Sequence, residues 1–147
     1  DMLGLITFSN NAQVVLPPTA QNEAGRASVL AALERVQADA STNIWDGIRL
    51  AATLAADERF KGRHIVGMLL TDGYPNINPP RGIVPTLRSL KMPNPWTLHT
   101  YGFGYNLDSQ LLSEIAAWGG GQFGFIPDCT MVGTVFMNKM PQTLLIS

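Results

Sequence analysis

The stretch IVGMLLTDG, residues 65–73, decides the fold of this 147-residue chain. Six uncharged residues run directly into Thr-Asp-Gly. An apolar run of this length with turn residues behind it is typical of a strand that is covered on both faces in a parallel sheet. Ligands of open α/β sheets bind beyond the carboxyl ends of the strands. Asp72 is the first residue at that end able to hold a cation, so the stretch indicates both a central strand and a site.

Strands and helices alternate on both sides of this run. The spacing of apolar residues predicts strands at 2–8, 12–16, 64–71, 96–103 and 122–126, and helices at 23–38, 44–58, 83–91, 107–118 and 130–140. Residues 9–11, Ser-Asn-Asn, form the turn of a hairpin that Pro17 and Pro18 end. We therefore expect an open, mostly parallel, twisted α/β sheet with helices on both faces and one antiparallel edge hairpin.

Two loops are expected at the same edge of that sheet. Thr42 or Asn43 caps the helix at 44–58, and Asp46 lies in its first turn, where the helix dipole favours a carboxylate. Right-handed crossovers place the strand-to-helix loops along one edge. The Thr42 hydroxyl and the Asp72 carboxylate are therefore candidates for one shared site.

Composition excludes several classes of function. The chain is 46% hydrophobic and 14% charged with a net charge of −1, and its ten Lys and Arg residues are scattered, whereas nucleic-acid binding needs a basic face. No apolar run approaches the roughly 20 residues that span a bilayer. The single cysteine, Cys129, excludes an internal disulfide framework and any multi-cysteine zinc site. Together with the absence of an N-x-S/T sequon, it favours a reducing, intracellular compartment.

No motif indicates an enzyme. GGGQFG at 119–124 matches G-x-G-x-x-G literally, but it follows a helix and precedes a strand, the reverse of a dinucleotide loop, so its glycines are expected to end the helix. The chain has neither a Walker lysine motif nor a nucleophile elbow. His64 and His99 sit at or inside predicted strands, which favours structural roles. Cys129 has no evident catalytic partner.

Taken together, five segments resemble a von Willebrand factor type A domain over nearly the whole chain: 3–9 with Ala12, 42–44 with 47–48, 65–73, 98–104 and 111–125. Segments 125–128 and 132–136 are similar to the subset found in large multidomain proteins, some of which carry a Hint-type module. Such domains hold a metal-ion-dependent adhesion site built from three loops. The resemblance assigns the site's threonine to Thr42 and its aspartate to Asp72. The D-x-S-x-S motif that follows the family's first strand is missing from this sequence, and Asp1 precedes a strand.

The resemblance implies that residues 1–147 are a single domain that lacks the first, central strand at its N-terminal side. Losing five or six buried apolar side chains removes on the order of 8–18 kcal/mol. A domain has only about 5–15 kcal/mol of net stability. We therefore expect that residues 1–147 alone do not form a stable monomer, and that an upstream segment or another chain supplies a strand.

The expected function is a non-catalytic, adhesion-type protein–protein interaction module with a partial metal site. Thr42 and Asp72 are the metal ligands, and Asn43, Gly73 and Tyr74 form the partner-binding rim. Mg²⁺ is the expected cation, bound weakly or not at all by this incomplete site, and an acidic residue of a protein partner would complete its coordination. The alternative is a structural or scaffolding domain of a larger assembly without a functional metal site.

Overall fold

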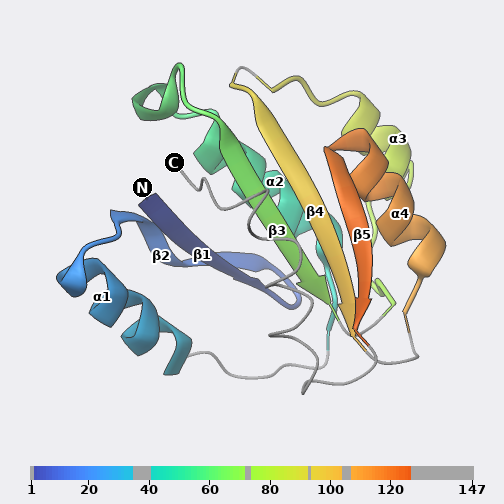
Figure 1. Cartoon of the computed structure of the whole chain (residues 1–147). Helices are drawn as coiled ribbons and strands as arrows, with labels where there is room; N and C mark the ends of the chain where they lie inside the picture. Colours follow the sequence, from blue (N-terminus) through green and yellow to red (C-terminus); the bar gives the residue numbers. More distant parts are fainter. Residues whose placement is uncertain (1, 35–40, 72–73, 93, 104–106, 127–147) are drawn as a thin grey trace.

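The computed structural model describes residues 2–34, 41–71, 74–92, 94–103 and 107–126. Strands and helices alternate along most of the chain (Figure 1). The elements are β1 Met2–Phe8, β2 Ala12–Ala20, α1 Glu23–Glu34, α2 Ile44–Ala55, the 3-10 helix η1 Glu58–Phe60, β3 Ile65–Thr71, α3 Ile83–Arg88, β4 Trp96–Phe103, α4 Ser109–Trp118 and β5 Gly120–Ile126. The predicted helix at 130–140 lies outside the described residues. No described helix is both long and apolar enough to cross a membrane.

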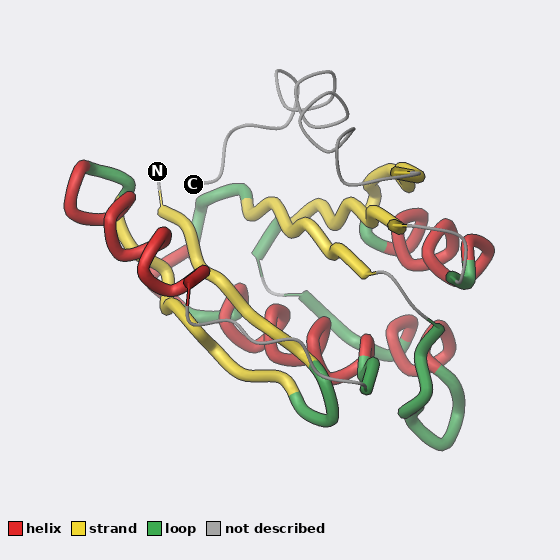
Figure 2. Tube along the Cα trace, turned by 90° about the horizontal axis from the view of Figure 1, so that it is seen from below, coloured by secondary structure: helices red, strands yellow, loops and turns green. Residues whose placement is uncertain are grey.

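The strands form two separate sheets. β3, β4 and β5 make a parallel sheet in sequence order, and β1 pairs antiparallel with β2. Seen from below, the hairpin stands apart from the parallel sheet, with α2 beside both (Figure 2). This arrangement confirms the predicted α/β class. It differs from one continuous sheet because no described strand joins β1 to β3.

The main core lies on one face of the parallel sheet. It joins α2, α3 and α4 to β3 and β4, and it consists of Ile44, Ile48, Leu69, Ile83, Leu87, Leu98, Leu107, Leu112 and Ile115. Trp96 and Trp118 pack edge to face beside it, with ring centroids 5.7 Å apart. α1 lies against β2, and none of its described residues belongs to this core. One apolar cluster therefore holds both α2, which follows Thr42, and the C-terminal half of β3.

Several predicted boundaries were wrong. β2 continues through Pro17 and Pro18 to Ala20, because it is an outer strand of its hairpin and proline is tolerated where no ladder donor is needed. α2 ends at Ala55, and the next residues form η1 with Asp57 as its cap. α4 begins at Ser109, two residues later than predicted, since Asp108 is its N-cap. β5 begins at Gly120, so the helix-ending glycines also start a strand.

Candidate functional site

The loop before α2 is hydrogen-bonded to the loop after β3. The Thr42 amide donates to Asn76 Oδ1 at 2.9 Å, and the Asn76 amide donates to the Thr42 carbonyl at 3.1 Å. Asn76 lies four residues beyond Asp72, and the buried Thr71 ends β3 just before it. The two chain segments that carry the predicted ligands therefore meet at the carboxyl edge of the parallel sheet, at the bottom of Figure 1.

Asn43 joins this loop to the turn of the hairpin. It is the N-cap of α2, and its Oδ1 accepts from the Asp46 amide at 3.0 Å. Its Nδ2 donates to the Asn10 carbonyl at 2.9 Å, and its own amide donates to the Ser9 carbonyl at 2.9 Å. Only 8% of Asn43 is exposed. A single buried side chain thus caps the helix and holds the end of β1 next to Thr42.

Asp46 makes a second link between α2 and the hairpin. Its Oδ2 accepts from the Ala12 amide at 2.6 Å, and Arg49 contacts its Oδ1 at 2.6 Å through Nη2. The hydrogen bond from the Ala12 amide, with a smaller contribution from Arg49, lowers the pKa of the Asp46 carboxyl, although partial burial acts in the opposite direction. The charged form of Asp46 is therefore the one that stabilises this edge.

Asp46→Asn is expected to reduce the free energy of unfolding by about 1.5 kcal/mol at neutral pH, because a hydrogen bond to a charged acceptor is weakened. A lowered folded-state pKa stabilises the protein above the unfolded value, near 3.9, and this contribution is lost as pH falls through the folded pKa. The wild-type and variant stabilities should therefore converge at the acid end of a urea series run from pH 7 to pH 3. An equal difference at every pH would contradict this assignment.

The predicted site residues differ in their accessibility. Thr42 is half-buried, and the Tyr74 side chain is well exposed at 59%. Asn43, predicted for the rim, is buried and uses its amide group within the chain. Asp72 and Gly73 lie outside the described residues. The structure thus brings Thr42, Asn43 and the segment containing Tyr74 to one edge.

Two contributors were missed by the sequence analysis. Asn76 lies in a Pro- and Asn-rich loop and was not singled out, and Asp46 was interpreted only as a first-turn carboxylate. The available signal was weak, because asparagine in such a loop is common and its hydrogen-bond partner, Thr42, is 34 residues away. Pairing over that distance cannot be seen in a local pattern.

The described residues do not form a cation site by themselves. Among them, no group of three or more His, Cys, Asp or Glu side chains is placed to hold a metal. Thr42 offers a hydroxyl, but the nearby Asp46 carboxylate is occupied by the Ala12 amide and Arg49. Mg²⁺ requires about six oxygen ligands, several of which are water. The Thr42 hydroxyl alone therefore does not make a Mg²⁺ site.

Comparison with known proteins finds a family that has this architecture. The model of the von Willebrand factor type A domain matches residues 1–137. The chain belongs to the von Willebrand factor type A family. Domains of this family are generally non-enzymatic interaction modules. Among curated relatives, the uncharacterized protein sll0103 of Synechocystis is 31% identical over 127 residues, which are 86% of this chain and 29% of that protein.

Solved structures support the type A fold. A von Willebrand factor type A protein from Catenulispora acidiphila superposes with a TM-score of 0.80 at 21% identity, over 93% of this chain and 32% of that one. Proximal thread matrix protein 1 from the mussel byssus, in a structure with a zinc-occupied MIDAS motif, gives a TM-score of 0.70 at 21% identity, over 93% of this chain and 33% of that one. This type A chain spans 25% to 29% of the curated relatives that it matches.

Proposed function

We propose that this type A domain is a non-catalytic, adhesion-type protein-interaction module whose partner binds at the edge that carries Thr42 and Asp72. The observation that carries the proposal is the double hydrogen bond between Thr42 and Asn76, which joins the two ligand-bearing segments. Gly73 and the exposed ring of Tyr74 form the rim in this proposal. Asn43 acts by positioning Thr42, because its side chain is engaged within the domain.

A divalent cation, Mg²⁺ or a similar hard ion, is the ligand that we propose for this edge. The family membership and the zinc-occupied motif of the mussel protein support a divalent cation. Thr42 would contribute its hydroxyl and Asp72 its carboxylate. Since the described residues add no further acidic ligand, cation binding by residues 1–147 alone is expected to be weak. An acidic side chain of the partner would complete the coordination.

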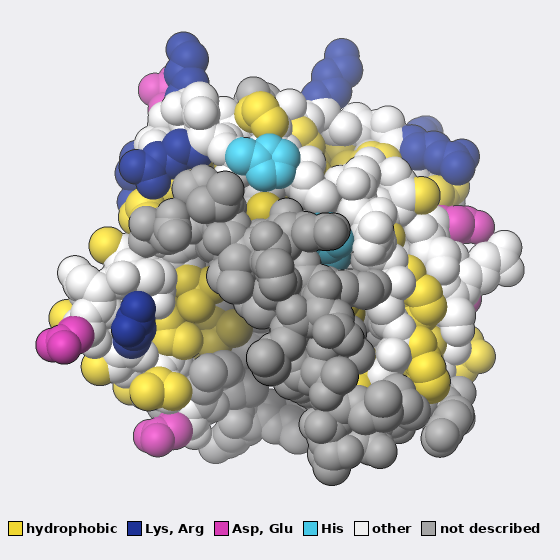
Figure 3. Space-filling view, in the orientation of Figure 1, with side chains coloured by type: hydrophobic (Ala, Val, Ile, Leu, Met, Phe, Trp, Pro, Cys, Tyr) yellow, Lys and Arg dark blue, Asp and Glu magenta, His cyan; other side chains and the backbone are white. Residues whose placement is uncertain are grey.

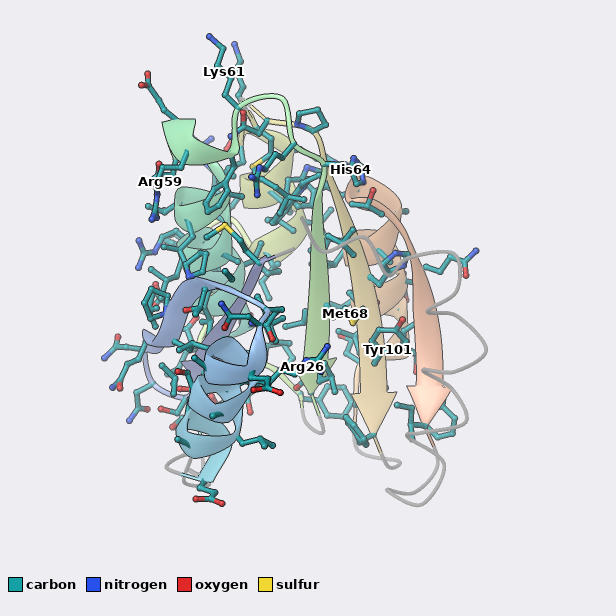
Figure 4. The ribbon with its side chains drawn as sticks, turned by 60° about the vertical axis from the view of Figure 1, so that its left-hand side comes forward. Arg26, Arg59, Lys61, His64, Met68 and Tyr101 are labelled. Carbon is teal, nitrogen blue, oxygen red and sulfur yellow. The ribbon has the colours of Figure 1, made fainter. Side chains whose placement is uncertain are left out.

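Mn²⁺ provides a direct test, because its unpaired electrons broaden nearby amide signals in nuclear magnetic resonance spectra. Millimolar Mn²⁺ is expected to broaden the amides of Thr42, Tyr74 and Asn76, and Asp72→Asn should abolish this effect. Asp57→Asn is the matched control, because Asp57 caps η1 beyond the other end of α2. Figure 4 shows Arg59 and Lys61, which follow Asp57, at the end of the molecule opposite the strand tips.

The possible results separate the two candidate functions. Broadening that is centred elsewhere, or that survives Asp72→Asn, would contradict the proposed site. Complete absence of broadening at this edge would favour a scaffolding domain without a functional metal site. Micromolar affinity for Mg²⁺ or Mn²⁺ in calorimetry would contradict the expectation that the site is incomplete.

A further inference from the structure

Basic side chains gather at the end of the molecule opposite the edge that carries Thr42. Four of them are exposed and lie in the two connections that lead into β3 and β4: Arg59, Lys61, Arg63 and Lys91. Figure 3 shows Lys and Arg side chains over this end, at the top of the view. We call these four residues the amino-edge patch, because they lie where the parallel strands begin.

Hydrogen bonds hold the two connections together. Asn94, in the connection that leads into β4, is buried, and its Nδ2 donates to the carbonyl of Ala55 at 2.7 Å and to that of Asp57 at 3.3 Å. The Ile65 amide, at the start of β3, donates to the Pro95 carbonyl at 3.0 Å. The cations of the amino-edge patch are far apart in the sequence, but they are carried by segments that are bonded to each other.

The charge at this end of the molecule is positive. Asp57 and Glu58 are the acidic residues of these two connections, and Asp57 pairs with Arg59, whose Nε lies 3.2 Å from Asp57 Oδ1. The three remaining cations of the patch therefore face one carboxylate. The other acidic residues that the structure describes lie on α1, in the first turn of α2, and on α4 or at its cap. Since the whole chain has a net charge of −1, folding produces this positive end, not composition.

The basic side chains at this end point away from one another. Figure 4 shows Lys61 extending from the tip of the molecule, with Arg59 and His64 below it on opposite sides. A single phosphate or carboxylate is bound by charged donors that converge on it, often as a bidentate pair. A lysine ammonium is a hydrated point charge on a flexible stem, without a fixed direction. Diverging charges of this kind suit an anionic partner that is spread over an area.

An acidic peptide or a nucleic acid fits this end less well. Acidic motifs are recognised by Arg clusters that form bidentate pairs, whereas the Arg59 guanidinium is already engaged by Asp57 and lies 5.3 Å from the centroid of the Phe60 ring. Single-stranded nucleic acids stack their bases on aromatic side chains. Here Phe60 is buried, and Trp96 packs on Trp118. A broad anionic surface needs neither feature, so it is the partner that the patch fits best.

We propose that the amino-edge patch binds the surface of an anionic lipid bilayer, with the beginnings of β3 and β4 facing the phosphate-bearing head groups. Each Lys or Arg near such a surface strengthens binding about fivefold. The seven residues of β3, at about 3.3 Å each, separate the patch from the carboxyl edge by roughly 20 Å. This is about twice the screening length at physiological salt. The edge that carries Thr42 therefore faces away from the bilayer, and the inference does not depend on the cation site.

Co-sedimentation with lipid vesicles tests the proposal. The chain should bind vesicles of equimolar phosphatidylcholine and phosphatidylserine but not vesicles of phosphatidylcholine alone, and high salt should release it, because the charges are exposed and screened. Lys61→Gln combined with Lys91→Gln should weaken binding about 25-fold, a factor of about five for each charge. The matched control is Arg26→Gln combined with Arg81→Gln, which removes the same charge from α1 and from the loop after β3 and should bind like the wild type.

Hydrogen exchange locates the contact, and other polyanions test the class of partner. On vesicles the amides of residues 58–64 should become protected, whereas the Asn76 amide at the opposite edge should not change. Polyglutamate and a DNA duplex, at the same concentration of negative charge, should bind more weakly than the vesicles. Tighter binding of either would overturn the proposal and identify an acidic protein or a nucleic acid as the partner. No binding to anionic vesicles, equal binding to neutral ones, or equal weakening by the control variant would also overturn it.

Discussion

Gly121→Ala is expected to reduce the free energy of unfolding by about 3 kcal/mol or more, which is a large share of the stability of a small domain. A Cβ atom at this position would overlap the carbonyl oxygen of Leu98 and lie 2.6 Å from the Leu98 carbonyl carbon and 3.0 Å from the His99 amide nitrogen. These are backbone atoms of β4, which cannot move aside as a flexible side chain can. β5 would have to separate from β4 and lose its ladder hydrogen bonds.

The neighbouring Gly120 supplies a matched control. Its φ is +68°, and a Cβ there would meet no atom within 4 Å. Gly120→Ala should therefore cost only the backbone penalty of about 1–2 kcal/mol. Urea unfolding followed by tryptophan fluorescence measures both variants, because Trp96 and Trp118 pack together next to this junction. Equal losses for the two variants would show that close approach to β4 is not what requires Gly121.

Asn43→Ala is expected to lower stability by about 2–3 kcal/mol, the sum of a lost N-cap and a lost buried hydrogen bond. The substitution removes the acceptor for the Asp46 amide and the donor to the Asn10 carbonyl. Because Thr42 is the preceding residue, the same change should also reduce the broadening of the Thr42 amide by Mn²⁺. Thermal unfolding and the Mn²⁺ titration measure the two effects separately.

Asn43→Asp separates the two roles of this side chain. Aspartate retains an acceptor for the Asp46 amide and is favoured at a helix N-terminus, but it cannot donate to the Asn10 carbonyl. It should therefore recover roughly the capping part of the loss and leave the link to the hairpin broken. If Asn43→Asp were as unstable as Asn43→Ala, the cap would contribute nothing and the interpretation of Asn43 would be wrong.

The sequence was sufficient where structure follows from local patterns. The uncharged run that became β3, the turn at 9–11 and the cap of α2 each depend on neighbouring residues, so their signals lie within a few positions. The fold class followed from the alternation of these elements. The shared edge for Thr42 and the end of β3 followed from the handedness of crossovers, and the Thr42–Asn76 hydrogen bonds agree with it.

The features that the sequence did not predict depend on contacts between segments that are far apart in the chain. Gly121 was read as one of three helix-ending glycines, whereas its requirement comes from the backbone of β4. The length of β2 depended on which of its edges faces a partner, since proline is excluded only from a paired edge. Asn76 became visible as a site residue only once its loop was placed beside Thr42. None of these three features produces a periodic pattern or a motif in the sequence.

The attachment of the hairpin has a mechanical consequence. In the described part of the chain, the hydrogen bonds between the hairpin and the loop–α2 segment, from Ser9, Asn10 and Ala12, all lie at the turn end. At the opposite end of β1, Met2 pairs with Ala20 of β2 and lines the same apolar cavity as Ile65. Because these bonds hold the turn end through Asn43 and Asp46, any tilt of the hairpin would displace the Met2 end most and leave the geometry of the Thr42 edge unchanged.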